Sequence, residues 1–156
     1  WDHLQPGSKT LLRFKVLLEL CRRFHEEPMN LGVQFSSSRD IYHHFQTRLG
    51  NLKQERFIIV ILDNKHRFLS ETTVTVGLLN RSLVHPREVF AEAIEQRAAA
   101  IICIHNHPSG DSSPSEEDKR ITRRLQESGE LLGIPLLDHI IISKEDFTSF
   151  ADEGWL

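Results

Sequence analysis

The sequence predicts a mixed α/β (α+β) domain, in which a central mixed sheet is flanked by helices. The apolar run 57–62 is rich in β-branched side chains and predicts a strand covered on both faces. A second apolar run, residues 98–104, predicts another buried strand, and segments with apolar side chains at helical spacing lie around both runs. A chain of 156 residues is long enough to enclose a substantial core in one such domain.

The first predicted element is a helix over residues 7–26, which Glu27-Pro28 ends. We expect this helix to pack against other parts of the protein through its apolar side. The predicted organisation is an N-terminal helix and connector, residues 1–34, followed by a larger unit, residues 35–156. The apolar side of the helix consists of Leu11, Leu12, Phe14, Val16, Leu17, Leu18 and Leu20.

The larger unit is predicted to begin with a helix and a hairpin. Several residues that cap helices precede a helix of residues 38–49, and Gly50 is placed to stop it. The strand 57–62 is then followed by a turn over residues 63–66 and a second strand over residues 68–79. Because the turn is short, we expect these two strands to be antiparallel neighbours.

The second half of the unit alternates helices and strands. Pro86 suits the first position of a helix that continues through Ile94, and the buried strand 98–104 follows. A helix from residue 116 to about residue 128 and a strand over residues 135–143 come next. Residues 145–156 are expected to form a short helix and tail.

The segment after the second apolar run carries the chemistry. His105-Asn-His107 is followed by seven residues and then by Ser115-Glu-Glu-Asp118. Side chains two apart on a strand point to the same face, so His105 and His107 offer two imidazoles side by side. The turn-rich loop 108–114 returns the chain to a new helix, where Asp118 reaches the same point from the first turn. Two imidazoles and one carboxylate, with a fourth position open, are the ligands of a catalytic zinc site.

Each part of this pattern also has a purely structural interpretation. A His-x-His pair on its own is common at surfaces and strand ends. Ser115-x-x-Asp118 is also a capping box, in which serine and the acidic side chain satisfy the first turn of a helix. The joint pattern of buried strand, histidine pair, turn-rich loop and acidic helix start favours a Zn²⁺ site.

The string from His105 to Asp118, HNHPSGDSSPSEED, resembles the RadC branch of the JAMM (MPN) metalloprotease family. The resemblance covers about residues 36–156 and includes Asp138-His139 near the end. It implies the JAMM/MPN architecture, which is similar to that of cytidine deaminases, and a zinc-dependent isopeptidase or peptidase. In RadC-like proteins a helix-hairpin-helix module precedes this domain, and residues 6–10 with the helix after them resemble only the tail of such a module.

A zinc hydrolase also needs a carboxylate that accepts a proton from water and passes it to the leaving amine. The candidates from the sequence are Glu55, Glu71, Glu116 and Glu117. The resemblance implies Glu55, at the mouth of the strand 57–62, with Glu71 as the alternative. It also implies that the hydroxyl of Ser115 stabilises the oxyanion formed during attack.

The pair Asp138-His139 has two open interpretations. A carboxylate and an imidazole in sequence can orient a metal ligand from behind, or they can form an ordinary hydrogen bond in the core. Arg120, Arg123 and Arg124, on the helix that carries Asp118, are interpreted as a solvated face.

Composition narrows the classes of protein. The formal net charge of −3 gives no general support for binding nucleic acid or an anionic membrane, and no apolar stretch approaches the length of a membrane span. The two cysteines, Cys21 and Cys103, form no C-x-x-C pair, which fits a cytoplasmic protein.

Three functional hypotheses follow. The first is a zinc-dependent peptidase or isopeptidase that acts on a peptide or protein conjugate. The second is a DNA-associated protein of repair or recombination, and the third is a metal-bound interaction module without turnover. The sequence predicts neither the substrate nor the oligomeric state.

Overall fold

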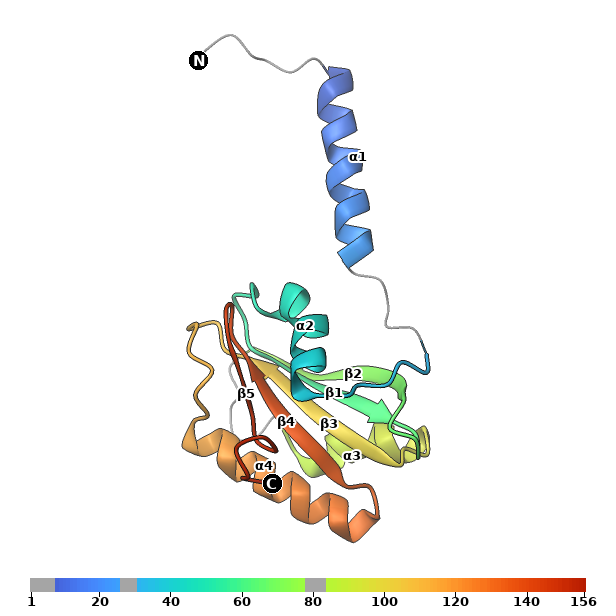
Figure 1. Ribbon diagram of the computed structural model, residues 1–156, viewed down its shortest axis with the longest axis vertical. Helices are drawn as coiled ribbons and strands as arrows, with labels where there is room; N and C mark the ends of the chain where they lie inside the picture. The colour runs from blue at the N-terminus through green and yellow to red at the C-terminus, as the bar shows by residue number, and fades with distance from the viewer. Residues whose placement is uncertain (1–7, 26–30, 78–83) are drawn as a thin grey trace.

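The computed structural model describes residues 8–25, 31–77 and 84–156 (Figure 1). Helices and strands alternate over most of this length, which agrees with the predicted mixed α/β class. The elements are α1 (Ser8–His25), α2 (Ser38–Leu49), β1 (Arg56–Leu62), β2 (Phe68–Val76), α3 (Pro86–Glu95), β3 (Ala100–Asn106), α4 (Glu116–Leu132), β4 (Leu136–Ile142) and β5 (Phe147–Ser149).

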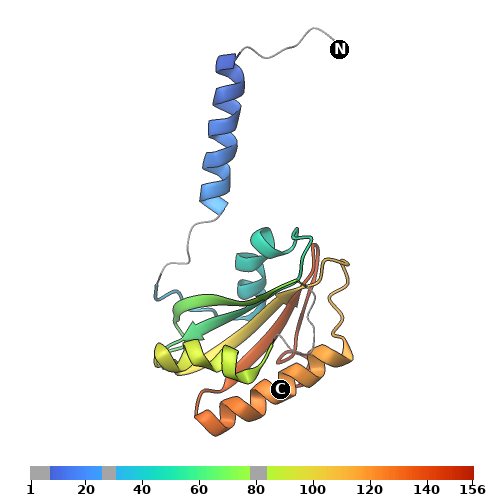
Figure 2. The same ribbon diagram turned by 180° about the vertical axis from the view of Figure 1, so that it is seen from behind.

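The sheet has five strands in the order β2-β1-β3-β4-β5. β3 and β4 are parallel and are joined by α4, whereas the other neighbouring strands are antiparallel. Helix α2 covers one face of the sheet, and α3 and α4 cover the other face (Figures 1 and 2). The predicted central sheet flanked by helices is therefore confirmed.

Strand β1 is buried on both faces, as its apolar run predicts. Successive side chains point to opposite faces of the sheet, so β1 contributes to two separate cores. Ile58, Val60 and Leu62 pack on the α2 side. Phe57, Ile59 and Ile61 pack on the side of α3 and α4. Strand β3 alternates in the same way, and this places His105 and Asn106 on opposite faces of the sheet.

A short turn joins β1 to β2, and the two strands are antiparallel as predicted. The carboxylate of Asp63 accepts hydrogen bonds from the backbone N–H of Lys65 at 2.8 Å and of Arg67 at 2.9 Å. It also accepts one from Nε of Arg67 at 2.8 Å. Strand β2 ends at Val76, and Gly77 follows with φ 107°. The predicted end of this strand at residue 79 lies outside the described residues.

The prediction of a short helix in residues 145–156 is wrong. Phe147–Ser149 instead forms β5, which pairs antiparallel with β4. The reason is tertiary: the carboxylate of Asp138 accepts hydrogen bonds from Oγ of Ser149 at 2.7 Å and from the backbone N–H of Ala151 at 3.0 Å. These bonds fix the C-terminal segment along the edge of the sheet.

Helix α4 runs beyond its predicted end at residue 128 to Leu132. Gly133 follows in the left-handed conformation with φ 69°, and this glycine stops the helix. Inside the helix, Gly129 lies so close to the following loop that a Cβ there would be 2.5 Å from the carbonyl oxygen of Ile134. The close approach lets the chain turn directly from α4 into β4.

Helix α1 forms over Ser8–His25, close to its predicted bounds. The expectation that it packs is not met within the described residues, because its apolar side chains are exposed, from 45% at Leu11 to 66% at Leu18. Figure 1 shows α1 apart from the sheet. Among the described helices, none is long and apolar enough to cross a membrane.

Candidate metal centre

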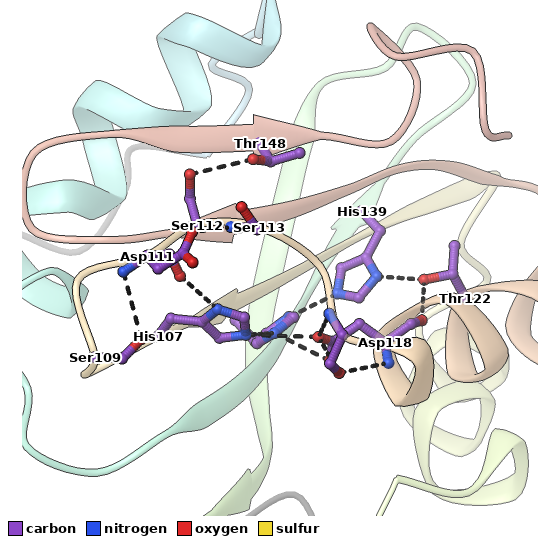
Figure 3. A network of polar contacts seen from close by, with 11 residues as sticks. His107, Ser109, Asp111, Ser112, Ser113, Asp118, Thr122, His139 and Thr148 are labelled. Carbon is purple, nitrogen blue, oxygen red and sulfur yellow. Dashed lines mark hydrogen bonds and ion pairs between the residues drawn. The ribbon is translucent and has the colours of Figure 1, made fainter.

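Three side chains from two elements meet at the end of β3. His105 is on the strand. His107 directly follows the strand, and Asp118 lies in the first turn of α4 (Figure 3). The two Nε2 atoms of the histidines are 3.0 Å apart. Nε2 of His105 is 3.3 Å from Oδ1 of Asp118, and Nε2 of His107 is 3.6 Å from Oδ2. One ligand atom from each residue lies within 4.8 Å of the others, so the group can hold a metal ion, as the sequence predicts.

The imidazole of His105 is fully buried and is held from behind by a chain of hydrogen bonds. Its Nδ1 is 2.8 Å from Nε2 of His139 on β4, and Nδ1 of His139 is 2.6 Å from Oγ1 of Thr122 on α4. The same hydroxyl is 2.6 Å from the carbonyl oxygen of Asp118, one turn earlier in the helix.

This chain determines which nitrogen of His105 carries its proton. A carbonyl oxygen only accepts, so Thr122 donates its single proton to Asp118 and accepts a hydrogen bond from Nδ1–H of His139. Nε2 of neutral His139 then accepts from Nδ1–H of His105. The lone pair of Nε2 on His105 is therefore directed toward His107 and Asp118, as a metal ligand requires.

The ring of His107 is oriented by the turn-rich loop. Its Nδ1 donates to the carbonyl oxygen of Asp111 at 2.7 Å, which leaves Nε2 facing the cluster. The loop is fixed in turn from within and from β5. The backbone N–H of Ser113 donates to Oδ1 of Asp111 at 2.8 Å, and Oγ1 of Thr148 donates to Oγ of Ser112 at 3.2 Å (Figure 3).

Asp118 is positioned by the predicted capping box. The backbone N–H of Asp118 donates to Oγ of Ser115 at 3.2 Å, and the backbone N–H of Ser115 donates to Oδ2 of Asp118 at 2.7 Å. Oγ of Ser115 is also 2.6 Å from Oδ2 and donates to it. The helix start thus satisfies its own backbone and presents the carboxylate to the histidines, so the structural and the metal interpretations of this motif hold together.

Burial and charge act in opposite directions within the cluster. Burial lowers the pKa of His105 well below its ordinary value, and the neighbouring His139 adds to this. The carboxylate of Asp118 raises the pKa of His107. Burial alone raises the pKa of Asp118, but the contact with His107 and the charge of His105 outweigh it and lower that pKa well below its usual range. The carboxyl group is therefore ionised at neutral pH, as a metal ligand must be.

Aromatic rings exclude water from the inner side of the centre. Phe57 stacks on His105 with a centroid distance of 5.9 Å, and Phe150 stacks on His139 at 4.9 Å. Burial lowers the pKa of His139 to about 4. His139 is thus neutral at pH 7, which is the state that the hydrogen-bond chain requires.

Glu55 lies just before β1, beside the cluster. Phe57, two residues later, pairs with His105 of β3. The hydrogen bond with Asp118 is the main cause of the raised pKa of His107, and the charge of Glu55 adds a smaller contribution. The two peptide groups around Glu55 are held by Asn106, the residue between the two histidines. Oδ1 of Asn106 accepts from the backbone N–H of Arg56 at 2.8 Å, and its Nδ2 donates to the carbonyl oxygen of Gln54 at 3.2 Å.

The alternative proton acceptors are engaged in ion pairs. Both carboxylate oxygens of Glu71 bind the guanidinium of Arg48, at 2.6 and 2.7 Å. Glu71 is paired across the sheet with Val60, which points to the α2 side, away from His105. Glu116 forms an ion pair with Lys119, and Glu117 forms one with Arg120. The structure thus places Glu71 on the other face of the sheet from His105, and the choice of Glu55 over Glu71 stays a prediction.

Sequence reasoning did not single out three of these contributors. Thr122 and Asn106 act through contacts with segments that are distant in the sequence. Asp111 acts through its backbone carbonyl. The structure also resolves the open question about the pair on β4: His139 supports the metal ligand, and Asp138 fixes the C-terminal segment.

Comparison with known protein families gives a match that includes all residues of the cluster. Residues 35–155 match the family model described as the RadC-like JAB domain. The chain belongs to the RadC-like JAB family. The predicted resemblance to RadC proteins is thereby confirmed.

Relatives in this family are similar over almost the whole chain. A UPF0758 protein of Syntrophotalea carbinolica is 47% identical over 150 residues, which cover 96% of this chain and 66% of the relative. A UPF0758 protein of Geobacter sulfurreducens is 43% identical over 151 residues, with 96% and 66% covered. One of Thermotoga maritima is 42% identical over 150 residues, with 96% and 67% covered. The chain thus spans about two thirds of the length of these relatives, whose names state no activity.

Proposed function

We propose that this chain is a zinc-dependent metallopeptidase or isopeptidase that hydrolyses an amide bond in a peptide or protein conjugate. The observation that carries the proposal is the convergence of His105, His107 and Asp118, whose ligand atoms lie within 4.8 Å of one another. Both histidines direct the lone pair of Nε2 into the cluster because their Nδ1 atoms donate elsewhere. The cluster lies at an outer corner of the fold, where His107 is partly exposed.

The donor set fits zinc. Two imidazole nitrogens and one carboxylate oxygen are ligands that Zn²⁺ accepts in catalytic sites, with one position left for water. A bound zinc ion would supply an acidified water and would polarise the scissile carbonyl group.

The residues of the chain perform the remaining steps. The carboxylate of Glu55 accepts a proton from the attacking water and passes it to the leaving amine. Asn106 holds the backbone on both sides of Glu55, so the carboxylate is presented without a large loss of freedom. In the structure, the hydroxyl of Ser115 donates its proton to Asp118. During the reaction, rotation of this hydroxyl directs the proton to the oxyanion of the intermediate.

Substitution of the proton acceptor tests this assignment. Glu55→Gln should bind zinc as the wild type does, but its rate of peptide cleavage should fall by about 10²–10⁴-fold, the usual contribution of a general base. Cleavage is measured by mass spectrometry on an unbiased peptide library with the zinc-loaded protein. Glu71→Gln, on the other face of the sheet, is the matched control and should retain activity.

The outcomes separate the three functional hypotheses. Full activity in Glu55→Gln would assign the proton transfer to another group. Stoichiometric zinc without cleavage of any library peptide by the wild type would favour an interaction module without turnover. Binding to duplex DNA that weakens steeply with salt would instead favour association with DNA, which the net charge of −3 does not support.

A further inference from the structure

A cavity of about 380 Å³ lies between α4 and the C-terminal segment. Its size falls within the range of about 300–1,000 Å³ that is typical of sites for small ligands. Four lining residues come from α4 and two from the segment after β5. They are Lys119, Thr122, Arg123, Gln126, Phe150 and Trp155.

Two residues that line the cavity, Thr122 and Phe150, also contact His139 behind the candidate metal centre. The hydroxyl of Thr122 contacts both the carbonyl of Asp118 and Nδ1 of His139, each at 2.6 Å. Phe150, on the opposite wall, stacks on the same histidine. Lys119, at one end of the lining, directly follows the candidate ligand Asp118 in the helix.

The lining residues of α4 extend over a distance that matches a short extended peptide. From Lys119 to Gln126 the helix rises about 10 Å, at roughly 1.5 Å per residue. An extended chain advances about 3.3 Å per residue, so this distance corresponds to about three residues. A peptide segment of about three residues can therefore lie along the lining residues of α4.

The charges of the lining favour a single negative charge. The ammonium group of Lys119 is 2.8 Å from the carboxylate of Glu116, which offsets its charge. Arg123 is exposed and forms no ion pair with any residue that the structure describes. Glu116 also interacts electrostatically with Arg123, so Lys119, Arg123 and Glu116 together carry one net positive charge, which attracts a carboxylate and repels a cationic side chain.

The remaining walls favour an aliphatic stem. Trp155 is 48% exposed and meets the buried ring of Phe150 edge to face, at a centroid distance of 5.3 Å. The two rings offer an apolar surface beside the guanidinium, and Gln126 adds an amide that can donate a hydrogen bond. A carboxylate on a short chain of methylene groups matches all of these features.

We propose that this cavity is a substrate subsite that binds a carboxylate on a short aliphatic stem, one to three residues from the amide bond that is cleaved. The source of the carboxylate is an acidic side chain of a peptide. The position relative to the cleaved bond rests on the proposed function, whereas binding of the carboxylate itself does not.

Titration followed by NMR tests the binding without any need for catalysis. The protein has two tryptophans, so Trp1→Phe leaves the indole N–H of Trp155 as a single reporter. The probes are acetyl-Ala-Ala-Glu-Ala-Ala-amide, its Gln and Lys counterparts, and acetyl-Ala-Ala-Ala with a free C-terminus. The Glu peptide should shift the indole signal and the amides of α4 near Arg123 in a saturable manner.

Variants on the same helix provide the control. Arg123→Gln should weaken the binding of the Glu peptide by about tenfold or more, which corresponds to roughly 1.4 kcal/mol of binding free energy. Arg124→Gln removes a neighbouring exposed arginine that does not line the cavity, and it should bind as the wild type does. A response to the free C-terminus that exceeds the response to the Glu side chain would contradict the proposed aliphatic stem.

Two results would overturn the subsite. One is the absence of saturable shifts at about 10 mM of every acidic probe, a concentration that detects even millimolar affinity. The other is equal binding of the Glu, Gln and Lys peptides. Either result leaves the metal centre and the role of Glu55 untouched, whereas loss of cleavage with intact peptide binding would count against the proposed function alone.

Discussion

Protonation of individual side chains decides whether His105, His107 and Asp118 can bind a cation. The imidazole of His105 presents an unprotonated Nε2 only because Nδ1 donates to His139, which in turn depends on Thr122. Hydrogen bonds behind a metal ligand fix its tautomer and raise its basicity. The candidate centre is therefore specified by five residues rather than by three.

Removal of the hydroxyl at the end of this chain should weaken metal binding. Thr122→Val keeps the shape of the side chain but leaves Nδ1–H of His139 without its acceptor. We expect zinc affinity to fall by about 10–100-fold, the usual effect of losing a residue that supports a ligand. Competition with a chromophoric chelator measures the affinity.

A second buried threonine serves as the control for this substitution. The hydroxyl of Thr75 is buried and has no hydrogen-bond partner among the residues that the structure describes. Thr75→Val should therefore leave zinc affinity unchanged and should not destabilise the fold. Equal zinc affinity in Thr122→Val and Thr75→Val would show that the tautomer of His105 does not depend on the chain through His139.

Asn106 is a positioning residue for Glu55 in the proposed reaction. Asn106→Asp keeps the acceptor for the N–H of Arg56 but loses the donor to Gln54, and Asn106→Ala loses both. We expect kcat to fall by about ten- to a hundredfold in the alanine variant, because small displacements of a reacting group are costly. Zinc affinity and KM should change little, and the aspartate variant should lie between alanine and wild type.

The split between these measurements distinguishes positioning from general support of the fold. Loss of zinc and kcat together in Asn106→Ala would indicate that Asn106 mainly holds β3 in place. An unchanged kcat would show that the loop before β1 holds Glu55 without it.

Residue types at a fixed spacing predicted the three candidate ligands, whereas Glu55 was implied by the resemblance to RadC-like proteins. His105, His107 and Asp118 are close in sequence, and the strand-loop-helix pattern between them is local, so their meeting point follows from it. Thr122 and His139 meet through the packing of α4 on β4, which no local pattern specifies.

Individual elements differ in how far local sequence determines them. The hairpin of β1 and β2 was predicted because Asp63 and its neighbours form a turn between two strand-forming runs. Residues 145–156 were expected to be helical, yet Phe147–Ser149 pairs with β4. The deciding partner, Asp138, lies on another strand, and a single-sequence pattern does not contain that contact.

The turn of the hairpin should make stability depend on pH in the acid range. The hydrogen bonds with Arg67 lower the pKa of Asp63 from 3.8 to about 2. A lowered carboxyl pKa contributes stability that is complete above the ordinary value and is lost as pH falls through the folded one. The difference in Tm between wild type and Asp63→Asn should therefore be constant above about pH 4 and should shrink toward pH 2.

Arg67→Gln removes the same ion pair from the other side and should reproduce this curve. A Tm difference between wild type and Asp63→Asn that persists unchanged to pH 2 would show that the charge of the carboxylate is not its source. The hydrogen bonds to the backbone of the turn would then be responsible.

On the scale of the whole molecule, topology gathers the candidate site. The parallel pair β3 and β4 is joined by α4, so the end of β3 and the start of α4 lie at one edge of the sheet. His105, His107 and Asp118 follow from this single crossover, and β1 brings Glu55 to the same edge. The mixed α/β class was predictable because buried strands and helices alternate clearly in the sequence, whereas the sequence patterns did not specify the parallel pairing of β3 with β4.

Other global features were not predictable from sequence patterns. The apolar side of α1 resembles that of a packed helix, but within the described residues it has no covering surface. The cavity between α4 and the C-terminal segment depends on Phe150 and Trp155, whose place results from the pairing of β5.

The most direct test of the account is anomalous diffraction at the zinc absorption edge from crystals grown with one equivalent of zinc. We predict one dominant peak at about 2.0–2.2 Å from Nε2 of His105, Nε2 of His107 and a carboxylate oxygen of Asp118. The peak should disappear in His107→Ala. A dominant peak at any other position, or an equally strong peak at this position in His107→Ala, would contradict the account.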